Sequence, residues 1–273
     1  MLIGGRRRQG EAKADAGAPK PPARNPFAGD YPVAEDISYI ARVGGQSVFF
    51  LTDDRYSRSW FYPRYLGGKL HEPFATRFLL NRLPKDGVFV DVGAHLGWFS
   101  LIAAAKARAV FALEALEFLI GRIHRNVAAN HLSNVQILLA AAGAAPGFAP
   151  MPKTGGPGSE VSAEGVTSLV PMVRLDDYFT GEFAPDVVKI DTEGYEFHVL
   201  EGALRMLEKK PVLMVELHRK IEHFGKARED VFDLLSDHGY RIHAASHRDP
   251  NAKLRQIARA DVAQINDAMV FCD

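Results

Sequence analysis

The chain contains 273 residues, of which 47% are hydrophobic and 24% are charged, as is ordinary for a soluble globular protein. Lys plus Arg and Asp plus Glu both number 33, and this zero net charge argues against broad attraction to nucleic acid or acidic membranes. The one cysteine, Cys272, excludes an intrachain disulfide and a cysteine metal cluster. We find neither an apolar stretch of membrane-spanning length nor a secretory signal, so a cytoplasmic protein is expected.

The composition changes along the chain and predicts a tail, a small extension and one large α/β domain. Residues 1–30 are rich in Gly, Ala, Pro, Lys and Arg, which bury too little to offset their ordering entropy, so a disordered tail is expected. Residues 31–70 predict a β extension or cap, with short strands at 37–40 and 47–51 turning at Gly44 and Gly45. Residues 71–273 are expected to form the main domain. An aromatic patch precedes it, either as a satellite core or as a substrate-facing lid: Trp60, Phe61, Tyr62 and Tyr65.

Residues 71–83 predict the first helix of the main domain. Phe74, Phe78 and Leu79 share one helical face, and Pro73 suits the first turn. Glu72 stands just before this helix. It can reach the ligand side of the sheet, or it can simply complement the positive end of the helix.

The central stretch is VFVDVGAHLGW, residues 88–98. Its apolar run is typical of a strand buried on both faces of a parallel sheet, with Asp91 near the end. Gly93 and Gly97 bracket a tight turn, and helix formers continue to Ala107. A helix N-terminus offers free N–H groups, and glycines let a ligand approach the backbone closely. The alternative is an ordinary strand-to-helix turn of any α/β protein.

A second strand, AVFALE at 109–114, ends in Glu114. An acid at the tip of the second strand, about 20 residues beyond the glycine turn, is where nucleotide-binding folds hold ribose hydroxyls. A solvated carboxylate at a helix start is the alternative. The turn itself is G-x-x-x-G and lacks the G-x-G-x-x-G of dinucleotide binders.

Residues 186–203 form the second informative stretch, DVVKIDTEGYEFHVLEGA. A buried strand closes at Asp191 and a helix opens at Gly194. Ligands of open parallel sheets bind outside the carboxyl ends of the strands, so Asp91 and Asp191 are expected to face one cleft. Asp191 is expected to have a ligand or a partner there. Glu193 and Glu196 either join it or complement the helix N-terminus.

A further strand, PVLMVELH at 211–218, brings Glu216 and His218 toward the same cleft. The near-neutral reference pKa of histidine suits a general base, although a hydrogen-bonded structural histidine fits equally. A divalent ion held by Asp191, Glu193 and Glu216 is conceivable, but the spacing is no metal signature and no metal is predicted. The remaining chain predicts a β excursion at 143–168, a helix at 224–238, a strand at 240–245 and a final edge strand at 268–272.

The motifs DVGAHLG at 91–97, FALE at 111–114 and KIDTEGYE at 189–196 together resemble the FkbM family of S-adenosylmethionine (SAM)-dependent methyltransferases. The order of elements matches from about Glu72 to Glu216. The resemblance implies an α/β, Rossmann-like class I methyltransferase fold, with a mostly parallel seven-stranded sheet and helices on both faces. It also implies SAM as cofactor and O-methylation of a hydroxyl on a sugar, a polyketide-like molecule or another small-molecule acceptor.

The resemblance, carried over by position, gives three sets of candidate residues together with the residue patterns, which supply Glu72, Glu216 and His218. The catalytic candidates are Asp191, His218 and Glu193, and Glu196 and Glu216 are assigned to the acceptor. His95 departs from the asparagine expected after Gly-Ala, and alanines stand where many class I enzymes place an acid for the adenine. The cofactor set is Glu72, Asp91, Gly93, Ala94, His95, Gly97, Glu114, Ala140 and Ala141.

Two other functions remain open from the residues. One is an NAD(P)-dependent oxidoreductase, which predicts the missing dinucleotide motif. The other is a non-catalytic SAM-binding module that has kept the fold. The expected partner is a small-molecule acceptor rather than nucleic acid or a membrane, and the oligomeric state cannot be read from the sequence.

Overall fold

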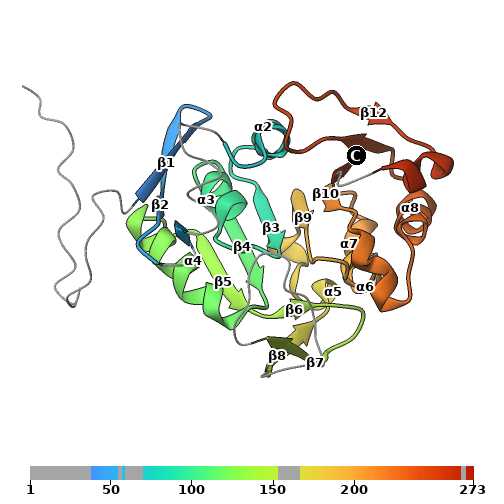
Figure 1. Ribbon diagram of the computed structural model, residues 1–273, viewed down its shortest axis with the longest axis horizontal. Coiled ribbons are helices and arrows are strands. Elements are labelled where there is room, and N and C mark those ends of the chain that lie inside the picture. The colour runs from blue at the N-terminus through green and yellow to red at the C-terminus, as the bar shows by residue number, and fades with distance from the viewer. Residues whose placement is uncertain (1–37, 55–56, 59–69, 153–166, 266–268) are drawn as a thin grey trace, which may run out of the picture. The chain divides into compact units, whose positions relative to one another are not determined.

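The computed structural model describes residues 38–54, 57–58, 70–152, 167–265 and 269–273, and the findings below concern these residues. The expected tail at 1–30 and the aromatic patch lie outside them, as do residues 153–166 of the β excursion expected at 143–168. Residues 35–273 form one compact unit. It contains an eight-stranded sheet and two small sheets of two and three strands (Figure 1). In the described part of the chain no helix is both long and apolar enough to cross a membrane.

The large sheet has the strand order β12-β11-β13-β10-β9-β3-β4-β5. Its parallel core consists of the neighbouring strands β10, β9, β3, β4 and β5, and β13 runs antiparallel between β10 and β11. The bounds are β3 Val88–Val92, β4 Ala109–Glu114, β5 Val135–Leu139, β9 Val187–Ile190, β10 Val212–Glu216, β11 Ile242–Ala245, β12 Arg255–Gln256 and β13 Met269–Cys272.

Two expectations about this sheet are corrected. It has eight strands instead of seven, because the two-residue strand β12, too short to leave a sequence pattern, pairs with β11 at the edge. The last strand was expected at the edge, but β13, Met269–Cys272, is interior, with β10 and β11 on its two sides. All four of its residues are buried, and they pack into the apolar layers on both faces of the sheet.

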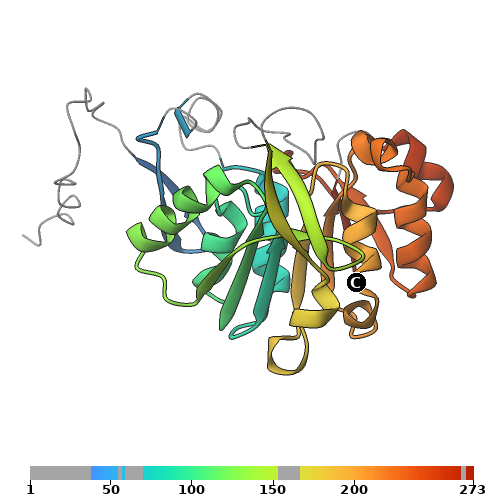
Figure 2. The ribbon, with the colours of Figure 1, turned by 90° about the horizontal axis from the view of Figure 1, so that it is seen from below.

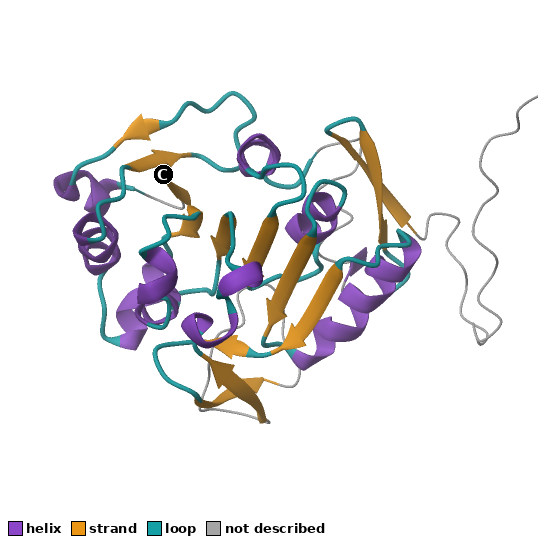
Figure 3. Cartoon of the chain, turned by 180° about the vertical axis from the view of Figure 1, so that it is seen from behind, coloured by secondary structure: helices purple, strands orange, loops and turns teal. Residues whose placement is uncertain are grey.

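Helices cover both faces of the sheet (Figure 3). Every residue of β3, β4 and β9 is buried, as continuous apolar runs predict. Phe89 points into one layer with Leu79 and Leu101, whereas Val90 points into the other with Val199 and Leu235. The first layer contains α2 Pro73–Arg82, α3 Trp98–Ala104 and α4 Glu117–Ala129, and the second contains α6 Glu196–Glu201, α7 Leu204–Leu207 and α8 Arg228–Asp237.

The expected hairpin is confirmed as β1 Ser38–Val43 and β2 Gln46–Leu51, which turn at Gly44 and Gly45. Asn126 of α4 joins this hairpin to the glycine turn. Its side-chain oxygen accepts a hydrogen bond from the Leu51 N–H at 2.9 Å, and its Nδ2 donates to the Leu96 carbonyl at 2.9 Å. The β extension therefore supports the turn from behind.

The remaining elements follow the sequence pattern with one difference. The β excursion forms a small sheet of β6 Ala141–Ala142, β7 Gly147–Pro152 and β8 Thr167–Val173, and Figure 2 shows the β7–β8 hairpin in front of the main sheet. The single helix expected at 224–238 is wrong, because Gly225 takes a left-handed φ of 72° and separates η3 Arg219–Phe224 from α8. The other short helices are α5 Leu175–Tyr178, η2 Gly181–Phe183 and η4 Arg259–Gln264.

Gly93 is where the glycine turn meets the loop after β9. Its φ is +79°, and an added Cβ would lie 1.9 Å from the Asp191 carbonyl oxygen. Gly45 has a matching φ of +78°, yet no described atom lies within 4 Å of its added Cβ. Gly45→Ala should therefore cost only the left-handed strain, about 1 kcal/mol of unfolding free energy. Gly93→Ala should cost about 3 kcal/mol or more, because steric overlap adds to that strain.

Urea unfolding of the two variants measures this difference. Equal losses of unfolding free energy would contradict the close approach of the two loops.

Candidate active site

The predicted acids gather at one edge of the sheet, where the parallel strands end. Asp91 lies in β3, Glu114 ends β4, Asp191 follows β9 and Glu216 ends β10. Two further predicted residues, Glu193 and His218, lie on the loops after β9 and β10. Asp91 and Asp191, which were expected to face one cleft, both contact a residue to which the sequence patterns assigned no role.

That residue is Lys189. Its register partner on β3 is Asp91, so the two side chains extend from the same face of neighbouring strands. The Lys189 Nζ lies 3.1 Å from Asp191 Oδ2 and 3.7 Å from Asp91 Oδ1, and it donates to the Gly93 carbonyl at 3.4 Å. The ammonium also lies 5.2 Å from the centre of the Phe99 ring. Lys189 thus links the glycine turn to the loop that carries Asp191.

Lys189 is only 2% exposed, so its charge needs partners. Burial alone disfavours the ammonium, but Asp191, Asp91 and Glu72 outweigh it and hold the pKa of Lys189 above its ordinary value. The sequence did contain a signal for this residue. A lysine inside the apolar strand VVKI is buried, and a buried lysine requires an acid beside it.

Asp91 fixes the start of α3. Its Oδ2 accepts a hydrogen bond from the Ser100 hydroxyl at 2.6 Å, and the whole residue is buried. Its Oδ1 has no hydrogen-bond partner among the described residues, with Lys189 at 3.7 Å. Burial raises the pKa of Asp91, although Lys189 and Ser100 oppose the shift.

Glu114 holds the glycine turn through backbone amides. Its Oε2 accepts from the His95 N–H at 2.7 Å, and its Oε1 accepts from the Leu116 N–H at 2.8 Å. His95 therefore contacts the acid through its backbone, which explains how a histidine can stand where an asparagine was expected. Burial raises the pKa of Glu114 to about 7 against these two donors.

The other residues of the predicted cofactor set surround this acid. Gly93 N and Ala94 N both donate to the Leu113 carbonyl, at 2.9 and 3.0 Å, and Gly97 is the N-cap of α3. Ala140 N donates to the Glu114 carbonyl at 3.1 Å, and Ala141 begins β6. The turn, Glu114 and the two alanines thus occupy neighbouring positions.

His218 lies at the centre of a group of four carboxylates. Its Nδ1 is 3.1 Å from Glu196 Oε1. Its Nε2 is 3.6 Å from Glu193 Oε2, 3.6 Å from Glu216 Oε1 and 3.9 Å from Asp191 Oδ1. Burial opposes the imidazolium, but the Glu196 hydrogen bond and the neighbouring acids raise the pKa of His218 to about 10. At neutral pH His218 therefore already carries the proton that a general base has to accept.

Asp191 is the partly open acid of this group, with 23% of its side chain exposed. Burial favours its protonated form, but Lys189 and His218 outweigh it and hold the pKa of Asp191 below its usual range. Glu193, 31% exposed, stands beside it with a left-handed φ of 56°. The carboxyl groups of Asp191 and Glu193 are thus both partly exposed at this end of the sheet.

Glu196 is fully buried and holds the loop from inside. Its Oε1 accepts from Thr192 N at 3.0 Å and from Gly194 N at 2.9 Å, besides contacting His218. Glu196 thereby fixes both the loop after β9 and the imidazole. Glu196 is therefore more deeply buried than Asp191 and Glu193, whose side chains are partly exposed.

Glu72 meets Glu216 and a residue that sequence patterns did not single out, His247. Burial raises the pKa of Glu72 to about 7 and that of Glu216 to about 9, in both cases with Asp191 adding to the shift. Burial and Arg248 lower the pKa of His247 to about 4. No sequence signal marks His247, because it follows β11 in a segment without apolar periodicity.

Known proteins resemble this chain. Residues 91–242, more than half of the chain, match a family model described as the methyltransferase FkbM domain. The chain is 30% identical over 208 residues to the hexuronic acid methyltransferase AglP of Haloferax volcanii, covering 75% of this chain and 80% of that protein. The crystal structure of methyltransferase FkbM from Methylobacillus flagellatus KT shares the fold, with a TM-score of 0.51 and 20% identity over 80% of this chain.

The chain spans 52% of the length of that crystallised protein, so the structural likeness bears on the fold alone. The family match disfavours the oxidoreductase that the sequence had left open. The glycine turn and both acidic motifs lie within the matched residues 91–242. The chain therefore belongs to the FkbM family of methyltransferases and has the α/β fold of class I methyltransferases.

Proposed function

We propose that this methyltransferase uses SAM to methylate an oxygen of a hexuronic acid or a closely related sugar. The observation that carries the proposal is the acid-rich sheet edge, where Lys189 connects the glycine turn with Asp191 and His218. The name of the Haloferax relative supports the class of acceptor. A hydroxyl group is the acceptor that we place first.

The residues at this edge fit a cationic donor. SAM carries a sulfonium and an ammonium group, and the buried Asp91 Oδ1 lacks a hydrogen-bond partner within the described chain. We assign ribose binding to Glu114, whose carboxylate already accepts two N–H bonds at the turn. The glycine turn from Gly93 to Gly97 and the alanines at 140 and 141 complete the proposed cofactor site.

SAM supplies an activated methyl group, so the protein mainly has to align donor and acceptor. We assign the removal of the hydroxyl proton to Asp191, with Glu193 as the second candidate. Lys189 engages Asp191 Oδ2, which leaves Oδ1 for the acceptor. A weak base is sufficient, because the hydroxyl oxygen becomes strongly acidic once it bonds to the methyl carbon. We assign to His218 and Glu196 the positioning of this loop.

The charge state of His218 favours a second candidate for the methylated atom, a carboxylate oxygen of the hexuronic acid. The contacts of His218 with Glu196, Asp191 and the other nearby acids keep it protonated, so His218 itself is not available as a neutral base. The carboxylate of a hexuronic acid is already ionised at neutral pH and requires no base at all. Methylation there would give an ester, whereas methylation of a hydroxyl gives an ether.

Mass spectrometry of a reaction with SAM tests this function. The acceptors are a hexuronic acid in glycosidic linkage and the matching hexose, which carries a CH₂OH group in place of the carboxylate. We expect S-adenosylhomocysteine and a singly methylated hexuronic acid. Mild alkaline hydrolysis then separates the two acceptor atoms, because an ester loses its methyl group and an ether keeps it. Binding of SAM without transfer to any sugar would contradict the proposed acceptor class.

Asp191→Asn tests the assigned base. The substitution keeps the shape of the side chain and removes its charge. We expect the rate of methyl transfer to a hydroxyl to fall about 10²- to 10⁴-fold, the usual contribution of a positioned base. The dissociation constant of SAM should change only a few-fold, as measured by isothermal titration calorimetry.

Asp233→Asn serves as the control, because Asp233 pairs with Arg259 on the exposed face of α8. It should leave both quantities unchanged. Full activity of Asp191→Asn would remove Asp191 from the mechanism.

His218 should make the stability of the protein depend on pH. Its pKa is raised from 6.5 to about 10 in the folded state, so its contribution is complete below pH 6.5 and is lost as the pH rises toward 10. The unfolding free energy of the wild type should therefore exceed that of His218→Asn most near pH 6.5. Urea unfolding between about pH 6 and pH 10 should show this difference shrinking.

Glu216 also contributes in the same direction, since the pKa of this acid is raised to about 9. The comparison with His218→Asn reports the histidine together with its coupling to Glu216, because His218 Nε2 lies 3.6 Å from Glu216 Oε1 and its charge lowers the pKa of that acid. A difference that stays constant across this pH range would show that folding does not raise the pKa of His218.

A further inference from the structure

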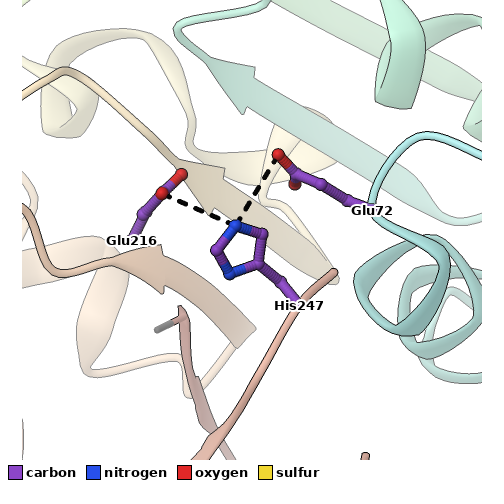
Figure 4. Close-up of side chains that lie close together, drawn as sticks. All are labelled: Glu72, Glu216 and His247. Atoms are coloured by element: carbon purple, nitrogen blue, oxygen red, sulfur yellow. Dashed lines mark ion pairs between the residues drawn. The ribbon is translucent and has the colours of Figure 1, made fainter. Parts of the chain in front are cut away.

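Three buried side chains from distant parts of the sequence converge beside the proposed active site. Glu72 is the N-cap of α2, Glu216 ends β10 and His247 follows β11. Figure 4 shows one ring nitrogen of His247 directed between the two carboxylates. That atom, Nε2, lies 3.6 Å from Glu216 Oε1 and 3.9 Å from Glu72 Oε1. Each residue offers one ligand atom, and these atoms all lie within 4.8 Å of one another.

The hydrogen bonding of this group is incomplete. His247 is 0% exposed and Glu72 is 5% exposed. Within the described residues, both ring nitrogens of His247 and Oε2 of Glu72 lack a hydrogen-bond partner. An unsatisfied buried polar group costs about 1–3 kcal/mol, so three such atoms in one place call for a missing partner.

The distances suit a shared ion better than direct hydrogen bonds. The separations of 3.6 and 3.9 Å are too long for hydrogen bonds. Two ligand atoms that each lie about 2.1 Å from one tetrahedral ion are separated by about 3.4 Å. Small rotations of the two carboxylates would therefore bring all three atoms into the coordination sphere of one ion.

The backbone holds the three segments in place. The His247 carbonyl accepts from the Phe74 N–H at 3.1 Å, and thus caps the first turn of α2. Glu72 itself has a left-handed φ of 42°, which is uncommon outside glycine and directs its side chain toward Glu216. The ligand atoms are consequently positioned by the fold, as a binding site requires.

We propose that Glu72, Glu216 and His247 form a site for one divalent transition-metal ion. One imidazole and two carboxylates form a mixed nitrogen and oxygen ligand set, which suits Mn²⁺ or Zn²⁺ better than Mg²⁺ or Ca²⁺. Three protein ligands leave at least one coordination position for water or for an acceptor oxygen. Such an ion would also join α2, β10 and the segment after β11.

Another cluster, Asp191, Glu193 and His218, also brings three ligand atoms together. It suits a metal less well, because two of its three members already accept hydrogen bonds from lysines: Asp191 from Lys189 at 3.1 Å and Glu193 from Lys220 at 3.2 Å. Its residues therefore provide the matched comparison for the metal site. The ammonium group of SAM is the other cation that Glu72 is placed to bind.

Isothermal titration of the full chain, freed of metal by a chelator, with MnCl₂ and separately with ZnCl₂ tests the site. We expect one saturable site for at least one of the two ions and a matching rise in the thermal unfolding temperature. Glu72→Gln and His247→Gln should each weaken that binding at least tenfold. Asp191→Asn and the exposed Glu208→Gln should retain it.

Absence of saturable binding of both ions in the wild type would overturn the proposal. Metal binding that survives Glu72→Gln and disappears in Asp191→Asn would also overturn it. Glu72→Gln is nearly isosteric and decides the matter if His247→Gln does not fold.

A parallel titration with SAM keeps this test separate from the proposed function. Loss of SAM binding in Glu72→Gln, with no metal bound to the wild type, would assign the group to the donor.

Discussion

The buried ammonium of Lys189 is the interaction on which the rest of the site depends. It lies between Asp91 on β3 and Asp191 after β9, and it also donates to the Gly93 carbonyl. Two carboxylates and one lysine at this depth are stable only as a group, since removing one member of a buried ion pair costs about 3–5 kcal/mol. The same contacts fix the glycine turn against the loop after β9, which carries Asp191. The arrangement therefore holds the two halves of the proposed site in one geometry.

The surplus of acids at this edge explains the chemistry proposed for it. Some of the acids accept hydrogen bonds from the backbone, as Glu114 does from His95 and Leu116, and Glu196 from Thr192 and Gly194. Others depend on protons or cations, since the pKa values of Glu72 and Glu216 are raised by burial. Such a site favours positively charged ligands. A sulfonium donor and a divalent ion, at neighbouring positions, would each relieve part of this charge imbalance.

Much of the fold follows from local patterns in the sequence. Continuous apolar runs mark β3, β4 and β9, because strands buried on both faces leave no room for alternation. The edge that collects Asp91, Glu114 and Asp191 then follows from the parallel order of these strands. β13 was misplaced because a short apolar segment does not reveal its neighbours. The break at Gly225 was missed because apolar spacing continues on both sides of it.

Side-chain partnerships were harder to predict, since they arise only when separate segments meet. Lys189 was visible as a lysine in a buried strand, but its two acids come from β3 and from the loop after β9. His247 left no signal, because its position depends on the contact between the segment after β11 and α2. His218 lies beside Asp191 and Glu216, where its position after a buried strand predicts it. Its protonated state, however, depends on Glu193, Glu196 and Glu216 together, and no single motif contains all of these residues.

A crystal structure of the protein with S-adenosylhomocysteine tests the central claim most directly, namely that the edge linked by Lys189 is the methyl-transfer site. We expect the ribose hydroxyls at Glu114 and the homocysteine sulfur facing Asp191, with the contacts between Lys189 and both aspartates retained. A nucleoside bound at another edge of the sheet would contradict the claim. So would a bound nucleoside that leaves Glu114 in contact only with the His95 and Leu116 amides.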